Sequence, residues 1–399
     1  MTPAPASDAA PEGGGHRHVL IVAGEASGDQ RGARLYEELR REVPDLAAYG
    51  LAGEALAAAG CEAIAESREI AVVGLVEVLK ILPRARAIFR KILGEVERRG
   101  TQTAILIDSP DFNLRLARQL KRRGLRVIYY VSPQVWAWRR GRVKQICRDV
   151  DLMLVLFPFE VDFYRQHGLD AVHVGHPLVD EVPQLRAAWD SRPLRGAGET
   201  ATVALLPGSR RSEVRSLLPG MLETVAELAR ERPIAARLIV APSFDESLLR
   251  QLVAAASLPA GAELEYVRGE GRFAAIADSH LALCASGTAT LEVGLLGTPM
   301  IVLYKLKTVS YWLARWLVDL PHFCIVNLVL GERVVPELLQ GETAPPKVAR
   351  LAGELLGDLA AIAALRGNLA RLRPALGEAG ASRRAAAAVA GRWRAWRLL

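Results

Sequence analysis

The sequence of 399 residues has no uninterrupted apolar run of about 18 residues, the length from which a membrane-spanning helix is predicted. Its four cysteines are far apart and form no CxxC pair, so we expect reduced thiols in a cytosolic protein. Residues 1–15 are rich in alanine, proline and glycine, and they lack the charged start and apolar core of a signal peptide. We therefore expect residues 1–17 to form a disordered tail.

Several nucleotide and metal motifs are also missing. No P-loop with a Gly-Lys-Ser/Thr ending occurs, so a kinase or an ATPase is not expected. The segment GEASGD, residues 24–29, is not a dinucleotide fingerprint, because its glycines are four residues apart and it contains two acids. No DxD element is evident in a predicted loop, so a metal is not needed to hold a diphosphate. We expect neither a metal nor a cofactor.

The composition is that of a globular protein, with 51% hydrophobic and 24% charged residues. The net charge of +7 and the pI of about 9.4 favour anionic partners, namely nucleotides, phosphates or an acidic membrane surface. The length suggests two domains.

The chain contains two series of alternating strands and helices, one on each side of a polar stretch. This predicts an α/β protein with two Rossmann-like βα domains. We assign them to residues 18–181 and 201–366, with a polar linker at 182–200. In each domain the strands present their carboxyl ends, where α/β enzymes bind ligands, to a cleft between the domains.

The second domain carries two predicted anion sites at strand ends. Ser286, Gly287 and Thr288 follow an apolar strand and precede a helix, whose free N–H groups suit a phosphate. Glu292, one turn inside that helix, is placed to accept hydrogen bonds from a ribose diol. The competing interpretation is an ordinary helix start capped by Ser or Thr.

The other anion site follows the strand at 202–206. Gly208, Ser209 and Arg210 stand there, and this loop aims a guanidinium and several N–H groups at a phosphate. The alternative is a surface arginine paired with Glu213.

The first domain carries carboxylates where its strands end. Asp108 and Asp111 follow the strand at 103–107. Asp111 is also explained as a helix cap, whereas Asp108 is harder to explain structurally, so we expect Asp108 to act in chemistry. Glu25 and Asp29, which flank Ser27 in GEASGD, suit sugar hydroxyls, and the alternative is a tight turn with an Asp cap.

Aromatic and basic residues follow the strand at 126–131, in the run SPQVWAWRRGR. Three interpretations compete for Trp136: it lines an acceptor cleft, it packs in a lid, or it stacks on nucleic-acid bases. We favour the first two and expect no nucleic-acid partner, because the cluster is short and lies within a βα alternation.

Residues 72–93 combine apolar side chains with five basic ones. Such a segment lies in a membrane interface or forms a core helix with a solvated basic side, and Pro83 is expected to break or kink it. The membrane interpretation predicts a contact patch formed by Val76, Leu79, Lys80, Ile81 and Arg84.

Eight motifs in order resemble one family, lipid-A-disaccharide synthase, an inverting glycosyltransferase of the GT-B fold. The likeness covers about residues 19–339, and the terminal segments lie outside it. The motifs are GEASGD (24–29), IDSPDFN (107–113), YVSPQVWAW (130–138), FPFE (157–160), VGHP (174–177), LLPGSRRSEV (205–214), ASGTATLE (285–292) and VNLVLG (326–331).

The resemblance implies transfer of 2,3-diacylglucosamine from UDP to 2,3-diacylglucosamine 1-phosphate, which forms a β-1,6-linked disaccharide and releases UDP. It implies that Asp108 is the catalytic base, that Arg210 contacts the diphosphate, and that Asn327 lies in a further nucleotide-facing loop.

The resemblance also implies peripheral attachment to the cytoplasmic face of the bacterial inner membrane. Because GT-B enzymes often return their last helix to the first domain, we expect the helices at 367–399 to pack there. We further consider a homodimer. A UDP-sugar 2-epimerase, which shares the fold, and a basic RNA-binding protein remain as alternatives.

Overall fold

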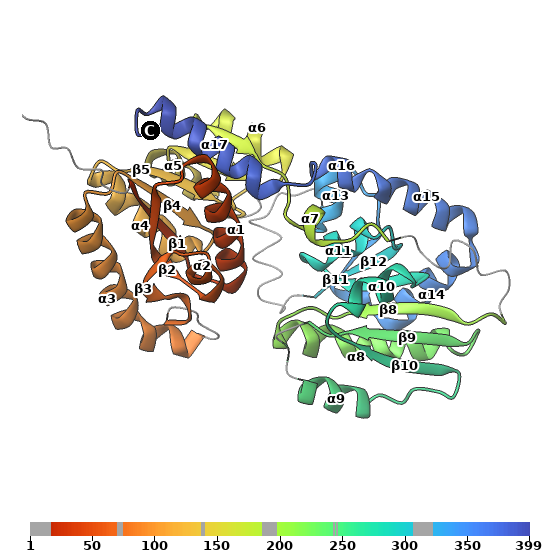
Figure 1. Cartoon of the computed structure of the whole chain (residues 1–399). Helices are drawn as coiled ribbons and strands as arrows, with labels where there is room; N and C mark the ends of the chain where they lie inside the picture. The colour runs from red at the N-terminus through yellow and green to blue at the C-terminus, as the bar shows by residue number, and fades with distance from the viewer. Residues whose placement is uncertain are drawn as a thin grey trace, which may run out of the picture.

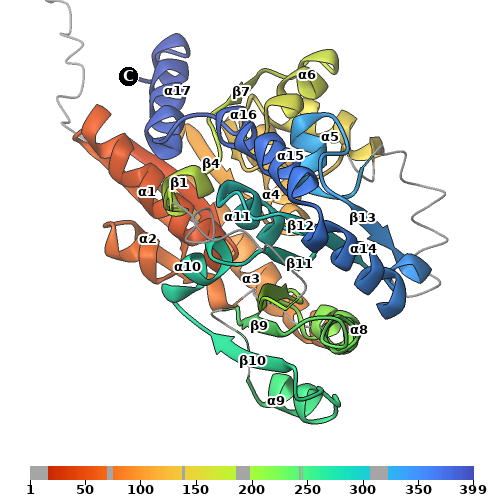
Figure 2. The same ribbon diagram turned by 90° about the vertical axis from the view of Figure 1, so that its right-hand side faces the viewer.

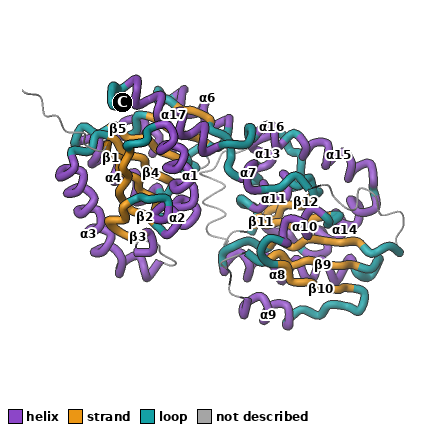
Figure 3. Tube along the Cα trace, in the orientation of Figure 1, coloured by secondary structure: helices purple, strands orange, loops and turns teal. Residues whose placement is uncertain are grey.

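The computed structural model describes residues 17–69, 75–136, 140–185, 198–241, 244, 246–305 and 322–399. Two lobes, each built on a central sheet with helices around it, are evident in Figure 1, and Figure 3 shows the strands at the centre of each lobe. Every pairing within both sheets is parallel, which confirms the predicted α/β class with two βα domains.

The N-terminal sheet has seven strands in the order β3-β2-β1-β4-β5-β6-β7. Its central strands are short apolar runs buried on both faces, as parallel sheets require. The strands are β1 (Arg17–Ala23), β2 (Leu46–Ala52), β3 (Glu62–Glu66), β4 (Thr103–Ile107), β5 (Arg126–Tyr130), β6 (Leu152–Val155) and β7 (Ala171–His173).

Helices cover both faces of this sheet. Leu35 and Leu39 of α1 pack into one core, whereas Ile88 and Ile92 of α3 and Leu120 of α4 pack into the other. The helices are α1 (Ala26–Glu42), α2 (Glu54–Ala58), α3 (Leu75–Arg99), α4 (Pro110–Arg122), α5 (Val143–Asp149) and α6 (Pro158–Gln166), with 3-10 turns at Ser67–Glu69 and Arg140–Arg142. The short α7 (Leu178–Glu181) follows the last strand and contacts the second domain.

The C-terminal sheet has six strands in the order β10-β9-β8-β11-β12-β13. They are β8 (Ala201–Leu206), β9 (Ile234–Ile239), β10 (Ala262–Val267), β11 (Leu281–Ala285), β12 (Met300–Tyr304) and β13 (Glu337–Leu339). The helices are α8 (Arg211–Leu228), α9 (Glu246–Ala254), α10 (Gly271–Ala277), α11 (Ala289–Leu295), α13 (Ile325–Leu330), α14 (Pro345–Gly357), α15 (Leu359–Ala370) and α16 (Leu372–Ala375), with a 3-10 turn at Gln340–Thr343.

The last helix, α17 (Ala381–Ala395), leaves the second domain and lies along α1 of the first, as Figures 1 and 2 show. Trp393, which is 1% exposed, donates from Nε1 to Thr103 Oγ1 at 3.0 Å, and Arg394 pairs with Glu42 at 3.2 Å. The expected return to the first domain is therefore confirmed for α17, but it is wrong for α16, which belongs to the expected segment 367–399 and packs against α11 and α13 of the second domain.

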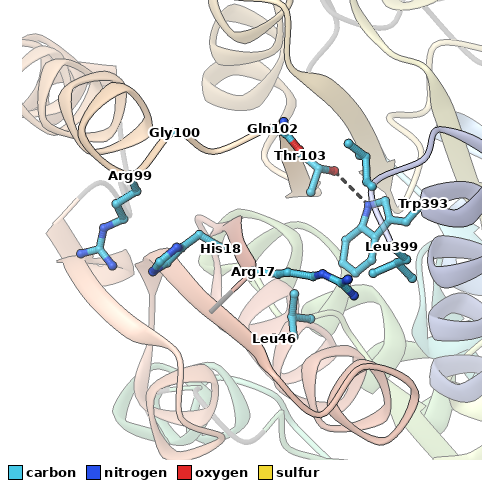
Figure 4. Close-up of a pocket in the computed structure, with 10 residues that line it drawn as sticks. Arg17, His18, Leu46, Arg99, Gly100, Gln102, Thr103, Trp393 and Leu399 are labelled. Carbon is cyan, nitrogen blue, oxygen red and sulfur yellow. Dashed lines mark hydrogen bonds between the residues drawn. The ribbon is translucent and has the colours of Figure 1, made fainter. Parts of the chain in front are cut away.

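A small cavity marks the place where this helix ends (Figure 4). Arg17, His18, Leu46, Thr103 and Trp393 are among its lining residues. The cavity lies at the amino ends of β1, β2 and β4, away from the strand ends that carry the predicted site. We therefore treat it as part of the docking of α17 and not as a substrate site.

Some boundaries differ from the sequence-based expectation. Helix α1 begins at Ala26, so the last four residues of GEASGD are helical. Helix α3 continues through Pro83 to Arg99, so the segment does not break there, and the alternative of a kink at Pro83 stays a prediction. The predicted membrane residues Val76, Leu79, Lys80 and Ile81 fall in its first turns, whose side chains lie outside the described residues. Within the described residues, no helix is long and apolar enough to cross a membrane.

Candidate functional site

The carboxyl end of β4 holds Asp108 in an unusual backbone conformation. Asp108 and the following Ser109 both have positive φ angles, of 50° and 44°, and Val131 at the end of β5 has a φ of 68°. Non-glycine residues rarely adopt this conformation, and where they do the strain is often associated with a functional site.

Four hydrogen bonds hold this turn. Asp108 N donates to Tyr130 O at 3.0 Å, and Asp108 O accepts from Tyr129 Oη at 2.6 Å and from Asn113 Nδ2 at 2.9 Å. Ser109 N donates to Asp108 Oδ1 at 2.9 Å. The other carboxylate oxygen, Asp108 Oδ2, accepts no hydrogen bond from the described residues. The turn therefore presents this oxygen without a partner among those residues.

The surroundings of Asp108 change its acidity. Burial raises the pKa of the Asp108 carboxyl above its usual value, whereas the charge of Arg31 and the bond from Ser109 N lower it. A raised pKa makes a carboxylate a better proton acceptor near neutral pH. No pattern in the sequence pointed to Arg31, which is one of many arginines and belongs to no motif.

Glu25 links the two domains electrostatically. Partial enclosure raises the pKa of Glu25, the neighbouring carboxylate of Asp108 raises it further, and Arg210 and Arg31 lower it. Arg210 belongs to the C-terminal domain, so the charge at the predicted diphosphate site acts on a carboxylate of the first domain. Ser27 lies exposed in the first turn of α1, beside Glu25.

The loop after β8 forms a compact turn around Glu213. Gly208 has a φ of 106°, and a Cβ added there would lie 2.5 Å from Glu213 Oε2, so glycine is required. That oxygen accepts from Ser209 N and Arg210 N, both at 3.2 Å, and Arg210 Nη1 donates to Glu213 Oε1 at 2.7 Å. The predicted pairing of Arg210 with Glu213 is present, although the Arg210 side chain is 79% exposed.

The loop after β11 is more open. A Cβ added at Gly287 would meet nothing within 4 Å, which leaves room for a ligand close to the backbone. Ser286 Oγ donates to Phe323 O at 2.8 Å, and Thr290 Oγ1 donates to Gly287 O at 2.7 Å. The Thr288 side chain makes no capping bond to α11, so the expected Ser or Thr cap is absent from this described helix start.

Glu292 lies partly buried in the first turn of α11. Its nearest cation is Arg272 of α10, at 3.9 Å from Nε to Oε2. Burial raises the pKa of Glu292, Arg272 lowers it, and Glu181 at the end of α7 raises it. The 3.9 Å contact is too long for a hydrogen bond, so the carboxylate retains acceptor capacity. Arg272, like Arg31, lies in no recognisable motif.

Asn327 lies in α13 and is completely buried, so its side chain is not in the nucleotide-facing loop that the resemblance implied. Its Oδ1 accepts from Val334 N at 2.9 Å and Val335 N at 3.0 Å, and its Nδ2 donates to Val335 O and to Glu337. Glu337 also accepts from Phe323 N at 2.8 Å. The structure therefore corrects the expected role of Asn327. Its amide holds Glu337, which in turn bonds Phe323, the residue whose carbonyl accepts from Ser286.

Asp29 is likewise used within the fold. It is 5% exposed, and its carboxylate accepts from Gly53 N at 2.7 Å, Ala55 N at 2.9 Å and Leu56 N at 3.2 Å, at the start of α2. The structure places Asp29 as the cap of a neighbouring helix rather than as a side chain open to a sugar.

Two further residues of the predicted acceptor site have partners within the first domain. Asp111 is exposed in the first turn of α4 and pairs with Arg142 at 3.1 Å, so Ser109, and not Asp111, occupies the cap position. Trp136 is 7% exposed, and its Nε1 donates to Glu160 Oε1 at 3.0 Å within the first domain. Its ring packs edge-on against Phe159.

No group of three or more His, Cys, Asp or Glu side chains with metal-site geometry occurs in the described part of the chain.

The chain is similar to known proteins of one family along nearly its whole length. Residues 19–389 match the family model of lipid-A-disaccharide synthetase. The lipid-A-disaccharide synthases of Myxococcus xanthus and of Anaeromyxobacter sp. strain K are 43% and 44% identical, over 93% and 94% of this chain and 96% and 97% of their own. That of Geobacter sulfurreducens is 40% identical over 94% of this chain and 96% of its own.

Solved structures share the architecture at much lower identity. The kitacinnamycin glycotransferase has a TM-score of 0.58 at 18% identity, covering 93% of this chain and 98% of its own. MurG of Acinetobacter baumannii has a TM-score of 0.53 at 14% identity, covering 90% and 95%. These neighbours establish the GT-B fold alone. The match of the family model and the identity to the curated relatives go further, and they show that the chain belongs to the lipid-A-disaccharide synthase family and is a glycosyltransferase of lipid A biosynthesis.

Proposed function

We propose that the protein transfers 2,3-diacylglucosamine from its UDP derivative to the 6-hydroxyl of 2,3-diacylglucosamine 1-phosphate. UDP leaves the anomeric carbon as the new C–O bond forms, and the hydroxyl proton passes to Asp108. A single displacement converts the α-linked donor to a β-linked product. The observation that carries this proposal is the constrained Asp108 turn, electrostatically coupled through Glu25 to Arg210 of the other domain.

The donor side of the site is assigned to the C-terminal domain. Arg210 and the loop N–H groups at Gly208 and Ser209 would contact the diphosphate, and the open backbone at 286–288 would approach it from the second strand end. Glu292 would accept from the ribose hydroxyls. This arrangement would neutralise the charge of the departing UDP without a metal.

The acceptor side is assigned to the N-terminal domain. Asp108 offers an oxygen for the 6-hydroxyl proton, and the exposed Glu25 and Ser27 are placed to contact sugar hydroxyls. Asp29, Asp111 and Trp136 are left out of this set, because their polar groups are engaged within the first domain.

Both substrates carry acyl chains, so we propose that the enzyme works while bound peripherally to the cytoplasmic surface of the inner membrane. The apolar and basic start of α3 supports this location. A membrane-bound substrate then reaches the site without leaving the bilayer.

The reaction is tested by mass spectrometry and NMR of products formed from UDP-2,3-diacylglucosamine with and without the acceptor. We expect a disaccharide 1-phosphate with a β-1,6 linkage only when the acceptor is present. Free sugar released without acceptor would indicate an epimerase-like reaction, and an α linkage would exclude the single displacement.

A further inference from the structure

Arg31 is a partly buried cation close to the proposed base. It lies in the second turn of α1, and among the described residues its side chain forms neither an ion pair nor a hydrogen bond. Two other arginines of α1 differ, since Arg34 pairs with Glu181 at 2.7 Å and Arg41 pairs with Glu38. The guanidinium of Arg31 therefore keeps its donors for a ligand.

The start of α1 packs directly on the strand end that carries Asp108. A Cβ added at Gly28 would lie 3.6 Å from Ile107 Cγ2, and one added at Gly32 would lie 2.9 Å from Ile107 Cδ1. Ile107 is the last residue of β4 and precedes Asp108. Arg31 is a neighbour of both glycines on the helix surface, so this close packing brings Arg31 alongside the Asp108 turn.

The two flanks of α1 have different partners. Asp29 on one flank accepts from N–H groups at the start of α2. Arg31 lies on the opposite flank with Ser27 and Arg34, because residues three and four apart share a helix face. Arg34 pairs with Glu181 of α7, which contacts α11 of the second domain. The flank with Arg31 therefore faces the second domain, as the position of α1 in Figure 1 also shows.

The charge of Arg31 acts on groups from several segments around this place. Burial raises the pKa of Tyr130, at the end of β5, to about 12, and Arg31 lowers it. Burial lowers the pKa of His176, which follows β7, to about 3, and Arg31 lowers it further. Together with the packing on β4, these effects place the guanidinium over the carboxyl ends of the strands, where ligands bind in α/β proteins.

We propose that Arg31 binds the 1-phosphate of the acceptor sugar. The inference rests on the proposed reaction and names the residue that recognises the charged end of its acceptor. The amino group of this acceptor is acylated, so the phosphate is its ionised group, whereas the diphosphate of the donor is assigned to Arg210 of the other domain. A guanidinium binds a phosphate through two parallel N–H···O bonds, which fix its orientation as well as its position.

The chemistry of the sugar fits this placement. The 6-hydroxyl and the 1-phosphate project from the same edge of the glucosamine ring, because the carbons that bear them flank the ring oxygen. A group that binds the phosphate must therefore lie near the base without being bonded to it. Arg31 meets both conditions, since its charge acts on Asp108 and the two side chains form no ion pair.

Arg31 also offsets the repulsion that the phosphate meets. Enclosure raises the pKa of Asp108 and of Glu25, and the charge of Arg31 lowers the pKa of each. The same charge therefore reaches both carboxylates that would repel a bound phosphate. Loss of this charge should weaken an acceptor that carries the phosphate more than one that lacks it.

The test compares two acceptors in the same detergent micelles, at a pH above the acid limb of the rate profile. One is 2,3-diacylglucosamine 1-phosphate, and the other is the 1-O-methyl glycoside of 2,3-diacylglucosamine, which lacks the phosphate. The ratio of their kcat/KM values measures the preference for the phosphate. We expect wild type to prefer the phosphate at least about tenfold, as a hydrogen bond to a charged group provides.

Arg31→Gln should lose most of this preference by raising the KM of the phosphorylated acceptor, while the methyl glycoside and UDP affinity change by less than about threefold. Arg31→Lys keeps the charge but not the fork, so an intermediate preference is expected. The matched control is Arg34→Gln, which removes the same charge from the same flank of α1 and should keep the wild-type preference within about twofold.

Three results would overturn the proposal: a wild type without preference, equal losses of both acceptors in Arg31→Gln, or an equal loss of preference in Arg34→Gln. The second result would confine Arg31 to an influence on Asp108 or on the fold. In all three cases the disaccharide is still formed, so the proposed reaction stands. A wild type that makes no disaccharide from either acceptor would overturn the proposed reaction itself, and this inference with it.

Discussion

Arg210 Nη1 donates to Glu213 Oε1 at 2.7 Å, so the guanidinium assigned to the diphosphate is bonded to a carboxylate of its own helix. The same carboxylate accepts from Ser209 N and Arg210 N, which are N–H groups that a phosphate would use. In this arrangement Glu213 competes with a diphosphate for Arg210 Nη1 and for these two N–H groups.

This competition predicts the effect of Glu213→Gln. The amide keeps an acceptor for the loop N–H groups but removes the competing charge, and an exposed ion pair is worth up to about 1 kcal/mol. We expect UDP to bind up to about fivefold more tightly, as measured by calorimetry. Weaker binding would show that Glu213 orients Arg210 for the diphosphate rather than competing with it.

Asp108→Asn tests the proposed base. The amide keeps the size of the side chain and loses the proton acceptor, and general base catalysis typically contributes 10²–10⁴-fold. We expect kcat to fall at least about a hundredfold while UDP affinity and Tm stay close to wild type. Asp111→Asn is the matched control, because Asp111 lies three residues away in an exposed ion pair. If Asp108→Asn turns over within about tenfold of wild type, Glu25 becomes the next candidate.

Glu292→Ala tests the ribose contact. A charge-assisted hydrogen bond contributes roughly 1.5–3 kcal/mol, so we expect UDP affinity to fall about ten- to a hundredfold. The loss should be much smaller for 2′-deoxy-UDP if the 2′-hydroxyl is the partner. Equal losses for both nucleotides would place Glu292 away from that hydroxyl, and unchanged UDP affinity in a folded variant would remove it from the site.

The acid limb of the pH profile depends on the pKa of Asp108. Because burial raises this pKa, kcat/KM should fall with decreasing pH at a higher pH than an ordinary aspartate would cause. Arg31 lowers the pKa of Asp108, so Arg31→Gln should move the acid limb further toward neutral pH. The test is to measure kcat/KM of wild type and Arg31→Gln from acid to neutral pH. An acid limb at the same pH in both proteins would show that a group other than Asp108 controls it.

The raised pKa of the buried Glu160 predicts that the stability of the protein depends on pH. Burial raises the pKa of Glu160 to about 7 and outweighs the hydrogen bonds from Phe157 N and Trp136 Nε1, which favour the charged form. In the unfolded chain this carboxyl loses its proton near pH 4.3. The folded state therefore binds the extra proton between roughly pH 4.3 and 7, and stability falls as pH rises through this window, because the folded state must either keep the proton or bury the charge.

Glu160→Gln cannot ionise and should lack this slope. Urea unfolding at several pH values between about 4.5 and 7.5 should show the free energy of unfolding of wild type falling relative to the variant, by a total on the order of 3 kcal/mol. Parallel pH dependence of the two proteins would mean that Glu160 is ionised in the folded state throughout.

Much of the fold was predictable because its strands are short apolar runs closed by glycine, proline or polar residues. The strand at 103–107 and the strand and helix on either side of Ser286, Gly287 and Thr288 were located in this way, since a parallel strand buried on both faces has to be apolar throughout. Asp108, Arg210 and Glu292 were predicted for the same reason, because the carboxyl ends of these strands are where polar side chains can approach a ligand.

The roles of Asp29, Asn327 and Trp136 were not decided by the sequence. Asp29 and Trp136 follow strand ends by a few residues, where a polar group that faces a ligand and one that bonds within its own domain have the same local pattern. Asn327 lies in α13, and its burial depends on contacts with a later segment. Asp29 meets N–H groups about 25 residues away in the chain, and Asn327 meets Glu337. Arg31 and Arg272 were missed for the opposite reason, because a lone arginine has no pattern until its neighbours are known.

The strands, their order along the chain, the motifs at their ends and the family to which these belong could be read from the amino-acid sequence, because all of them depend on residues close together in the chain. Three-dimensional folding was needed to show which polar side chains remain open to a ligand and that the charge of Arg210 acts on Glu25. These outcomes depend on distances between segments far apart in the chain, which local composition and periodicity do not encode.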